Sequence, residues 1–204
     1  VGTRSKEKLM ANHVRYTIDF QQINKAALTK LAEICSRVRT PEGYGDQWFG
    51  DMFVDGKEGS PTYEDTNNVN WAYENVGSKW CVVESMEVEK TWAQIAGYAG
   101  WNQPEEGTQW LMEQLAEVDE NLIGSLVYDD EMPNFFGVNV YDGDEPYYMR
   151  QWDDDELAEL VAEKKEEDDD EDEILWEVMR DHQQDVLHEI VNDIRSDREA
   201  FTSD

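Results

Sequence analysis

The sequence predicts an α+β fold, ferredoxin-like, in which an antiparallel sheet carries helices on one face and a C-terminal acidic helix follows. Three observations lead to this prediction. Short segments rich in β-branched and aromatic residues alternate with two segments of helical periodicity. The 204 residues include 8 Trp, 9 Tyr and 6 Phe, enough to build a core. After residue 152 the chain has 22 acidic residues against 5 basic ones, which sets the last quarter apart.

The first third of the chain predicts one strand and one helix. Residues 13–20 alternate between apolar and polar side chains, as a half-buried strand does. Residues 23–38 place apolar side chains at helical spacing and predict an amphipathic helix. Residues 39–69 are interrupted by Gly, Pro and Asp and predict a long loop or insertion with short strands or turns. Residues 1–9 are basic and aperiodic, and we expect them to be a leader added before a native start at Met10.

The middle of the chain predicts three strands and a second helix. Residues 70–88 favour two strands joined by a turn at residues 75–78, and residues 91–101 add a third strand. Residues 103–118 predict a helix, because Pro104 stands at its start, acidic residues occupy its first turn and apolar residues recur at helical spacing.

Two apolar segments, NLIGSLVYDD and FFGVNVYDGDE, then predict a hairpin around the turn EMPN. Trp152 marks the end of the domain expected over residues 10–152, and residues 153–204 form an acidic helical extension. The core aromatics and both amphipathic helices precede Trp152, so we expect the domain to fold without the extension. The order of elements favours an antiparallel sheet with helices on one face.

Part of the domain carries a recognisable pattern. Trp71, Asn75, Gly77, Lys79 and Trp80 stand where a known family has a Trp-x-x-x-Asn-x-Gly-Thr-Lys-Trp segment, with Ser in place of Thr. A later aromatic followed by a helix-opening Pro, and an acidic, Gly- and aromatic-rich hairpin, complete the pattern.

Over residues 10–150 the chain thus resembles the YubB-type ferredoxin-like domain family of bacteriophages and plasmids. The resemblance implies a ferredoxin-like fold and an origin in a phage or mobile element. It implies no catalytic activity. The acidic extension lies outside the family pattern.

The sequence shows no pattern typical of a catalytic, cofactor or metal site. Cys35 and Cys81 stand far apart and predict free thiols in a reducing compartment. His182 and His188 are six residues apart in one predicted helix and would point to different sides of it, which disfavours zinc. There is no phosphate-binding Gly loop or nucleophile motif. We therefore expect a non-enzyme that holds no cofactor and no metal.

Carboxylates in the extension recur at a fixed spacing of four residues. We call this series the acidic ladder: Glu173, Glu177, Asp181, Asp185, Glu189, Asp193 and Asp197. Like charges at this spacing destabilise a helix by about 0.2–0.5 kcal/mol per pair. Apolar residues from Leu175 to Ile194 recur at helical spacing and offer a packing face, which predicts that the ladder occupies the opposite face. A merely solvated acidic face is the alternative interpretation.

The acidic ladder is too sparse to match DNA by itself. A helix rises 1.5 Å per residue, so the ladder offers one carboxylate per ~6 Å, whereas duplex DNA carries one charge per ~1.7 Å. Neighbouring acids must add charge, and we expect five of them to belong to the same binding surface: Asp154, Asp155, Asp168, Asp169 and Asp170.

The net charge of −31 decides the class of partner. It repels nucleic acid and anionic membranes and attracts basic proteins. Together with the phage origin that the resemblance implies, this charge leads us to expect a phage protein that binds a basic, nucleic-acid-binding host protein and inhibits it by DNA mimicry. A restriction or defence nuclease, RNA polymerase and a nucleoid protein are the target classes, in the cytoplasm of the infected bacterium.

Two alternatives stay open at this point. The protein could be a phage structural or assembly component whose acidic helix pairs with a basic partner, or with a second copy through the apolar stripe. The acidity could also be an adaptation to high salt.

Overall fold

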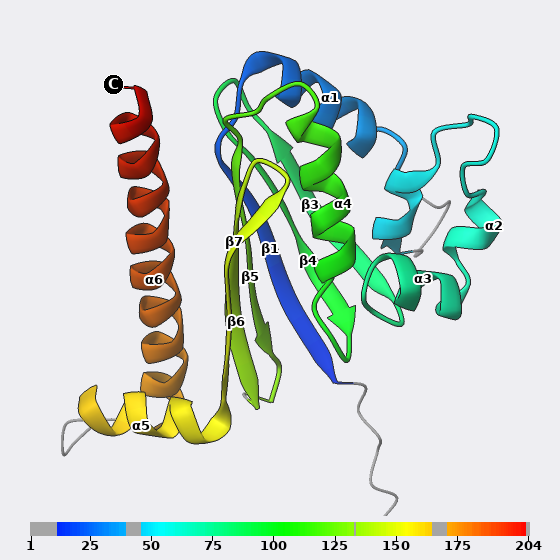
Figure 1. Ribbon diagram of the computed structural model, residues 1–204. Coiled ribbons are helices and arrows are strands. Elements are labelled where there is room, and N and C mark those ends of the chain that lie inside the picture. Colours follow the sequence, from blue (N-terminus) through cyan, green and yellow to red (C-terminus); the bar gives the residue numbers. More distant parts are fainter. Residues whose placement is uncertain (1–11, 40–45, 133, 165–170, 203–204) are drawn as a thin grey trace, which may run out of the picture.

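The fold is a single antiparallel sheet with helices packed on both of its faces (Figure 1). The structure is a computed structural model that describes residues 12–39, 46–132, 134–164 and 171–202. Within these ranges the sheet has seven strands in the order β2-β3-β4-β1-β5-β6-β7, and neighbouring strands are antiparallel throughout. The expected α+β class is confirmed. The expected leader at residues 1–9 lies outside the described residues.

The strands are β1 His13–Gln22, β2 Gln47–Trp48, β3 Cys81–Val88, β4 Ala93–Gly100, β5 Ile123–Asp130, β6 Phe135–Asp142 and β7 Glu145–Asp153. The helices are α1 Lys25–Cys35, the 3-10 helix η1 Phe49–Phe53, α2 Tyr63–Thr66, α3 Val69–Asn75, α4 Glu105–Ala116, α5 Asp154–Lys164 and α6 Glu171–Thr202.

Four strands and two helices form the centre of the fold. The chain runs β1-α1-β3-β4-α4-β5, and these strands lie in the order β3-β4-β1-β5. This arrangement is compatible with a β-α-β-β-α-β ferredoxin-like unit. On β1, Val14, Tyr16, Ile18 and Phe20 alternate toward the core under α1 and α4. The alternation that predicted this strand therefore arises from burial of one of its faces.

The other face of the sheet is packed by α6 (Figure 1). A second apolar cluster joins β5, β6 and β7 to α5 and α6, and its fully buried members include Phe136, Val138, Val140 and Ile194. Helices were expected on one face only, with the acidic helix as an extension. Instead, the C-terminal helix forms the third layer of the fold, and the boundary expected at Trp152 runs through this second cluster.

Two elements differ from the sequence prediction. Residues 70–88 were expected to hold two strands, but the first part is helix α3, because the Asn68 side chain caps its first turn by accepting from the N–H groups of Asn70 and Trp71. Strand β7 was not expected. Its side chains are mostly exposed, as at a sheet edge, so it lacks the apolar alternation that marks a buried strand.

Residues 39–69 match the expected irregular segment in their described part. It contains the two-residue strand β2, the 3-10 helix η1, the short helix α2 and the first residue of α3. Residues 40–45 lie outside the described residues. Phe53 stacks on Trp110 with ring centroids 3.9 Å apart and contacts Trp71 edge-on, so aromatic side chains anchor this segment to the domain.

Candidate functional site

The apolar side of α6 fixes the helix against the sheet. Val178, Met179, Val191 and Ile194 are buried there, and the other members of the predicted stripe are partly buried in the same cluster. The face that the sequence offered to a second copy is therefore occupied by the protein's own β5 and β6. A homodimer through this stripe, as expected above, would require α6 to leave the sheet.

Polar contacts also hold α6 in one register. The buried carboxamide of Gln183 donates to the carbonyl oxygens of Tyr128 on β5 and Gly137 on β6, at 2.9 and 3.2 Å. Near the end of the helix, Arg198 donates to the carbonyl of Asn121 at 2.7 Å and pairs with the carboxylate of Asp142. Contacts at both places restrict sliding and rotation of the helix.

The described carboxylates of the acidic ladder all face solvent. Glu177, Asp181, Asp185, Glu189, Asp193 and Asp197 are each exposed. The Glu173 side chain lies outside the described residues. Each step of four residues ends about 40° past a full helical turn, so the series winds about 200° around α6 from Glu177 to Asp197. The ladder is therefore a spiral over the exposed side of the helix, and the expectation of a single opposite face is corrected.

Two of the described ladder carboxylates have partners within the molecule. Asp181 lies 3.4 Å from Lys164 Nζ at the end of α5. The Asp197 carboxylate accepts from the Tyr147 hydroxyl of β7 at 3.1 Å, and this contact raises the pKa of Tyr147. Because the spiral turns back toward the sheet edge at Asp197, this last carboxylate is the least suited to meet a partner.

Of the five additional acids predicted for the binding surface, two lie in the described residues and three do not. Asp154 and Asp155 are exposed in the first turn of α5, where a negative charge is favourable beside the helix N-terminus. Asp153 and Glu156 form a capping box there: each side chain accepts from the other's backbone N–H, at 3.0 and 3.1 Å. Part of this acidity thus serves to start a helix. Asp168, Asp169 and Asp170 lie outside the described residues.

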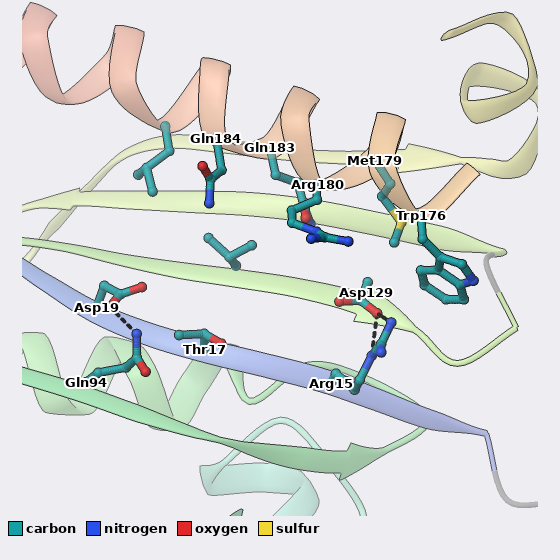
Figure 2. Close-up of a pocket in the computed structure, with 12 residues that line it drawn as sticks. Arg15, Thr17, Asp19, Gln94, Asp129, Trp176, Met179, Arg180, Gln183 and Gln184 are labelled. Carbon is teal, nitrogen blue, oxygen red and sulfur yellow. Dashed lines mark hydrogen bonds and ion pairs between the residues drawn. The ribbon is translucent and has the colours of Figure 1, made fainter. Parts of the chain in front are cut away.

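The structure also contains a cleft that the sequence did not indicate. Because α6 lies mainly against β5 and β6, it leaves the same face of β1 and β4 uncovered (Figure 1). The cleft between helix and sheet has a volume of about 640 Å³. Figure 2 shows its lining, which comes from both layers: Arg15, Thr17, Asp19, Gln94, Val127, Asp129, Trp176, Met179, Arg180, Gln183, Gln184 and Leu187.

At one end of this cleft two cations face one carboxylate. The Arg15 guanidinium pairs with Asp129 of β5 and lies 4.6 Å from the ring centroid of Trp176. Arg180 of α6 reaches toward the same carboxylate in Figure 2. Burial raises the pKa of Asp129, and the two guanidiniums oppose that shift.

The other end holds a carboxylate without a cation. Asp19 accepts a hydrogen bond from Gln94 Nε2 at 2.8 Å, and no ion pair to Asp19 occurs among the described residues. Burial raises its pKa, because desolvation outweighs this single hydrogen bond. The alternation of β1 could have placed Asp19 on the face opposite the core, but only the position of α6 makes that face a cleft.

Other chemistry finds little support among the described residues. No group of three or more His, Cys, Asp or Glu side chains there is arranged to hold a metal ion. Burial raises the pKa of the Cys35 and Cys81 thiols to about 11 and about 12, so both are protonated and poorly nucleophilic near neutral pH. In the same part of the chain, no helix is both long and apolar enough to traverse a bilayer.

Comparison with known proteins assigns no family to the chain: no family model matches it, and no curated protein or solved structure is significantly similar to it.

Proposed function

We propose that this protein binds a basic, nucleic-acid-binding protein of a bacterial host through the exposed carboxylates of α6 and inhibits it by imitating DNA. The observation that supports the proposal most is the fixed, outward-facing acidic ladder. The apolar face of α6 is buried, Gln183 and Arg198 tie the helix to the sheet, and the described ladder carboxylates remain exposed.

Fixing the carboxylates in place favours binding. A flexible acidic tail would lose conformational entropy when a partner ordered it, whereas a helix already packed on a sheet loses little. The like-charge repulsion along α6 is offset by apolar burial within the protein, so the charges stay closely spaced without a partner. A basic partner then relieves this repulsion on binding.

The winding of the ladder indicates the shape of the partner site. Carboxylates spread over about 200° of the helix cannot all contact a flat surface. They suit a concave groove that covers the exposed side of the helix, while its apolar side stays on the sheet. The exposed Asp154 and Asp155 on α5 would extend the acidic surface beyond α6. A phage origin and a site of action in the host cytoplasm complete the proposal, and both rest on the family resemblance.

The test is capture from a bacterial lysate followed by release with duplex DNA. Immobilised full-length protein should retain DNA-binding proteins that excess duplex DNA displaces. The variant Glu177→Gln/Asp181→Asn/Asp185→Asn/Glu189→Gln keeps shape and removes four charges, and it should retain at least about tenfold less, with equal or higher helix content because i,i+4 repulsion is removed.

A charge-matched control separates the acidic ladder from bulk charge. Glu58, Glu74, Glu89 and Glu113 are exposed and lie outside α5 and α6. The fourfold Glu→Gln variant at these positions has the same net charge as the ladder variant and should retain captured proteins as the wild type does. Equal loss in both variants, or captured proteins that duplex DNA does not release, would contradict DNA mimicry. Recovery of the protein in purified phage particles would favour the assembly role instead.

A further inference from the structure

The cleft between α6 and the sheet carries an inference about the partner. Its open side is crossed by rows of side chains that share a face of neighbouring strands. One such row runs from the fully buried Ser125 through Asp19 and Gln94 to the exposed Glu87. Asp19 pairs in register with Ser125 and Gln94, and Gln94 pairs with Glu87. Residues directly opposite in an antiparallel pair have neighbouring side chains on the same face.

This row presents acceptor atoms. Gln94 uses its amide nitrogen to bond one Asp19 oxygen, which leaves the second Asp19 oxygen and Gln94 Oε1 without a hydrogen bond to any described residue. The hydroxyl of Thr17, two residues earlier on the same side of β1, has no described partner either. A carboxylate oxygen and a carboxamide oxygen can only accept. The neighbouring hydroxyls of Thr17 and Ser125 form no hydrogen bond to either oxygen, so both oxygens are open to a donor from outside.

The charges around Asp19 also favour a ligand that donates hydrogen bonds and is cationic. Arg15 lies about 13 Å from Asp19 along β1, from a rise of about 3.3 Å per residue, and is already paired with Asp129. The half-buried Asp19 therefore bears a desolvation cost that no cation among the described residues offsets. Glu87 adds a second carboxylate to the same row. The bound group should be cationic and rich in donors.

We propose that the Asp19 end of this cleft binds a guanidinium group, supplied by an arginine side chain of the basic partner. A guanidinium is planar and presents a fork of N–H donors, which fits a carboxylate oxygen beside a carboxamide oxygen better than a compact ammonium does. Arg15 and Arg180 both lie near Asp129, so the opposite end of the cleft repels a second cation. The source of the arginine rests on the proposed function, whereas the affinity of the cleft for a guanidinium does not.

The experiment uses full-length protein and a small probe, N-acetyl-arginine-N-methylamide, at low salt. Amide and side-chain NMR signals of Thr17, Asp19 and Gln94 should shift and saturate. The neutral, isosteric citrulline derivative should give no saturable shift, and the lysine derivative should bind several-fold more weakly than the arginine derivative. Asp19→Asn should weaken arginine binding at least about tenfold.

Glu113→Gln is the matched control, because it removes one exposed carboxylate on α4, which neither lines the cleft nor belongs to the acidic ladder. It should leave the affinity for the probe within about twofold of the wild type. Equal losses in the two variants would mean diffuse attraction to an acidic protein and would overturn the site, as would a citrulline derivative that binds like arginine or an arginine probe that does not saturate.

Folding of the Asp19→Asn variant can be checked independently. The pKa of Asp19 is raised in the folded protein, so its carboxylate lowers stability above that pKa and ceases to do so at acid pH. The variant should therefore be at least as stable as the wild type at neutral pH.

The two proposals can fail separately. If the probe binds as expected but capture of DNA-binding proteins does not depend on the acidic ladder, the proposed function fails and the proposed cleft site is retained. If capture depends on the acidic ladder but Asp19→Asn does not weaken probe binding, the cleft site fails and the proposed function is retained.

Discussion

Single residues decide how α6 meets the sheet, and Gln183 is the clearest case. The sequence does not show that Gln183 is buried, because its neighbour Gln184 is the same residue type and is exposed. Only the structure shows that Gln183 bridges the backbones of β5 and β6. Asp19 illustrates the same limit, since its strand was predicted correctly but its lack of a cation depends on tertiary contacts.

Gln183 and Gln184 form a natural pair for measuring this contact. Gln183→Leu removes two hydrogen bonds to buried carbonyl oxygens and should lower the free energy of unfolding by about 1–3 kcal/mol. Gln184→Leu removes none and should change it by less than about 0.5 kcal/mol. Urea denaturation followed by circular dichroism measures both. Similar values for the two variants would mean that Gln183 does not tie the helix to the sheet.

At the scale of elements, apolar periodicity predicted the helices and strands that pack closely in the core, and it missed those that bury few side chains. Strand β1 and helices α1 and α4 each bury one face, and the hairpin of β5 and β6 buries both faces. All of them were predicted at nearly their observed bounds. Strand β7 and helix α3 bury less, so the period of their apolar residues carries little information. The helical character and apolar stripe of α6 were also predicted, but periodicity shows only that a face is buried and does not identify what covers it.

Because α6 covers an apolar face of the sheet, removing it should unfold the domain that was expected to fold by itself. A chain ending after Trp152 would expose Phe136, Val138 and Val140, which α5 and α6 now help to bury. Each such side chain contributes about 1.5–3 kcal/mol when fully buried, so the loss approaches the whole stability of a typical domain, about 5–15 kcal/mol. We therefore expect the truncated chain to lose cooperative unfolding and to bind the dye ANS.

The fourfold ladder variant is the control for this truncation. Like the truncated chain, it lacks ladder carboxylates, but it keeps the apolar face of α6. It should therefore unfold cooperatively. A truncated chain that unfolds as sharply as the wild type would restore residues 10–152 as an independent domain.

At the scale of the whole molecule, charge and packing act in opposite directions. The net charge of −31 disfavours the compact state through self-repulsion, while two apolar clusters on the two faces of one sheet favour it. The sequence established the charge and the class of fold. It could not place the charge, because the distribution of acids around α6 follows from which side of that helix the sheet occupies.

This opposition predicts that salt has effects of opposite sign on folding and on binding. Between about 0.02 and 0.3 M NaCl the Debye length falls from roughly 20 Å to roughly 6 Å, which screens the repulsion among exposed carboxylates. The thermal midpoint should rise over this range, while the affinity for the captured basic partner should fall sharply, mainly through slower association. Calorimetry and surface binding kinetics in the same buffers measure the two effects. An affinity that stays constant would indicate an apolar interface, and a protein that unfolds below molar salt would indicate that its acidity is an adaptation to salt.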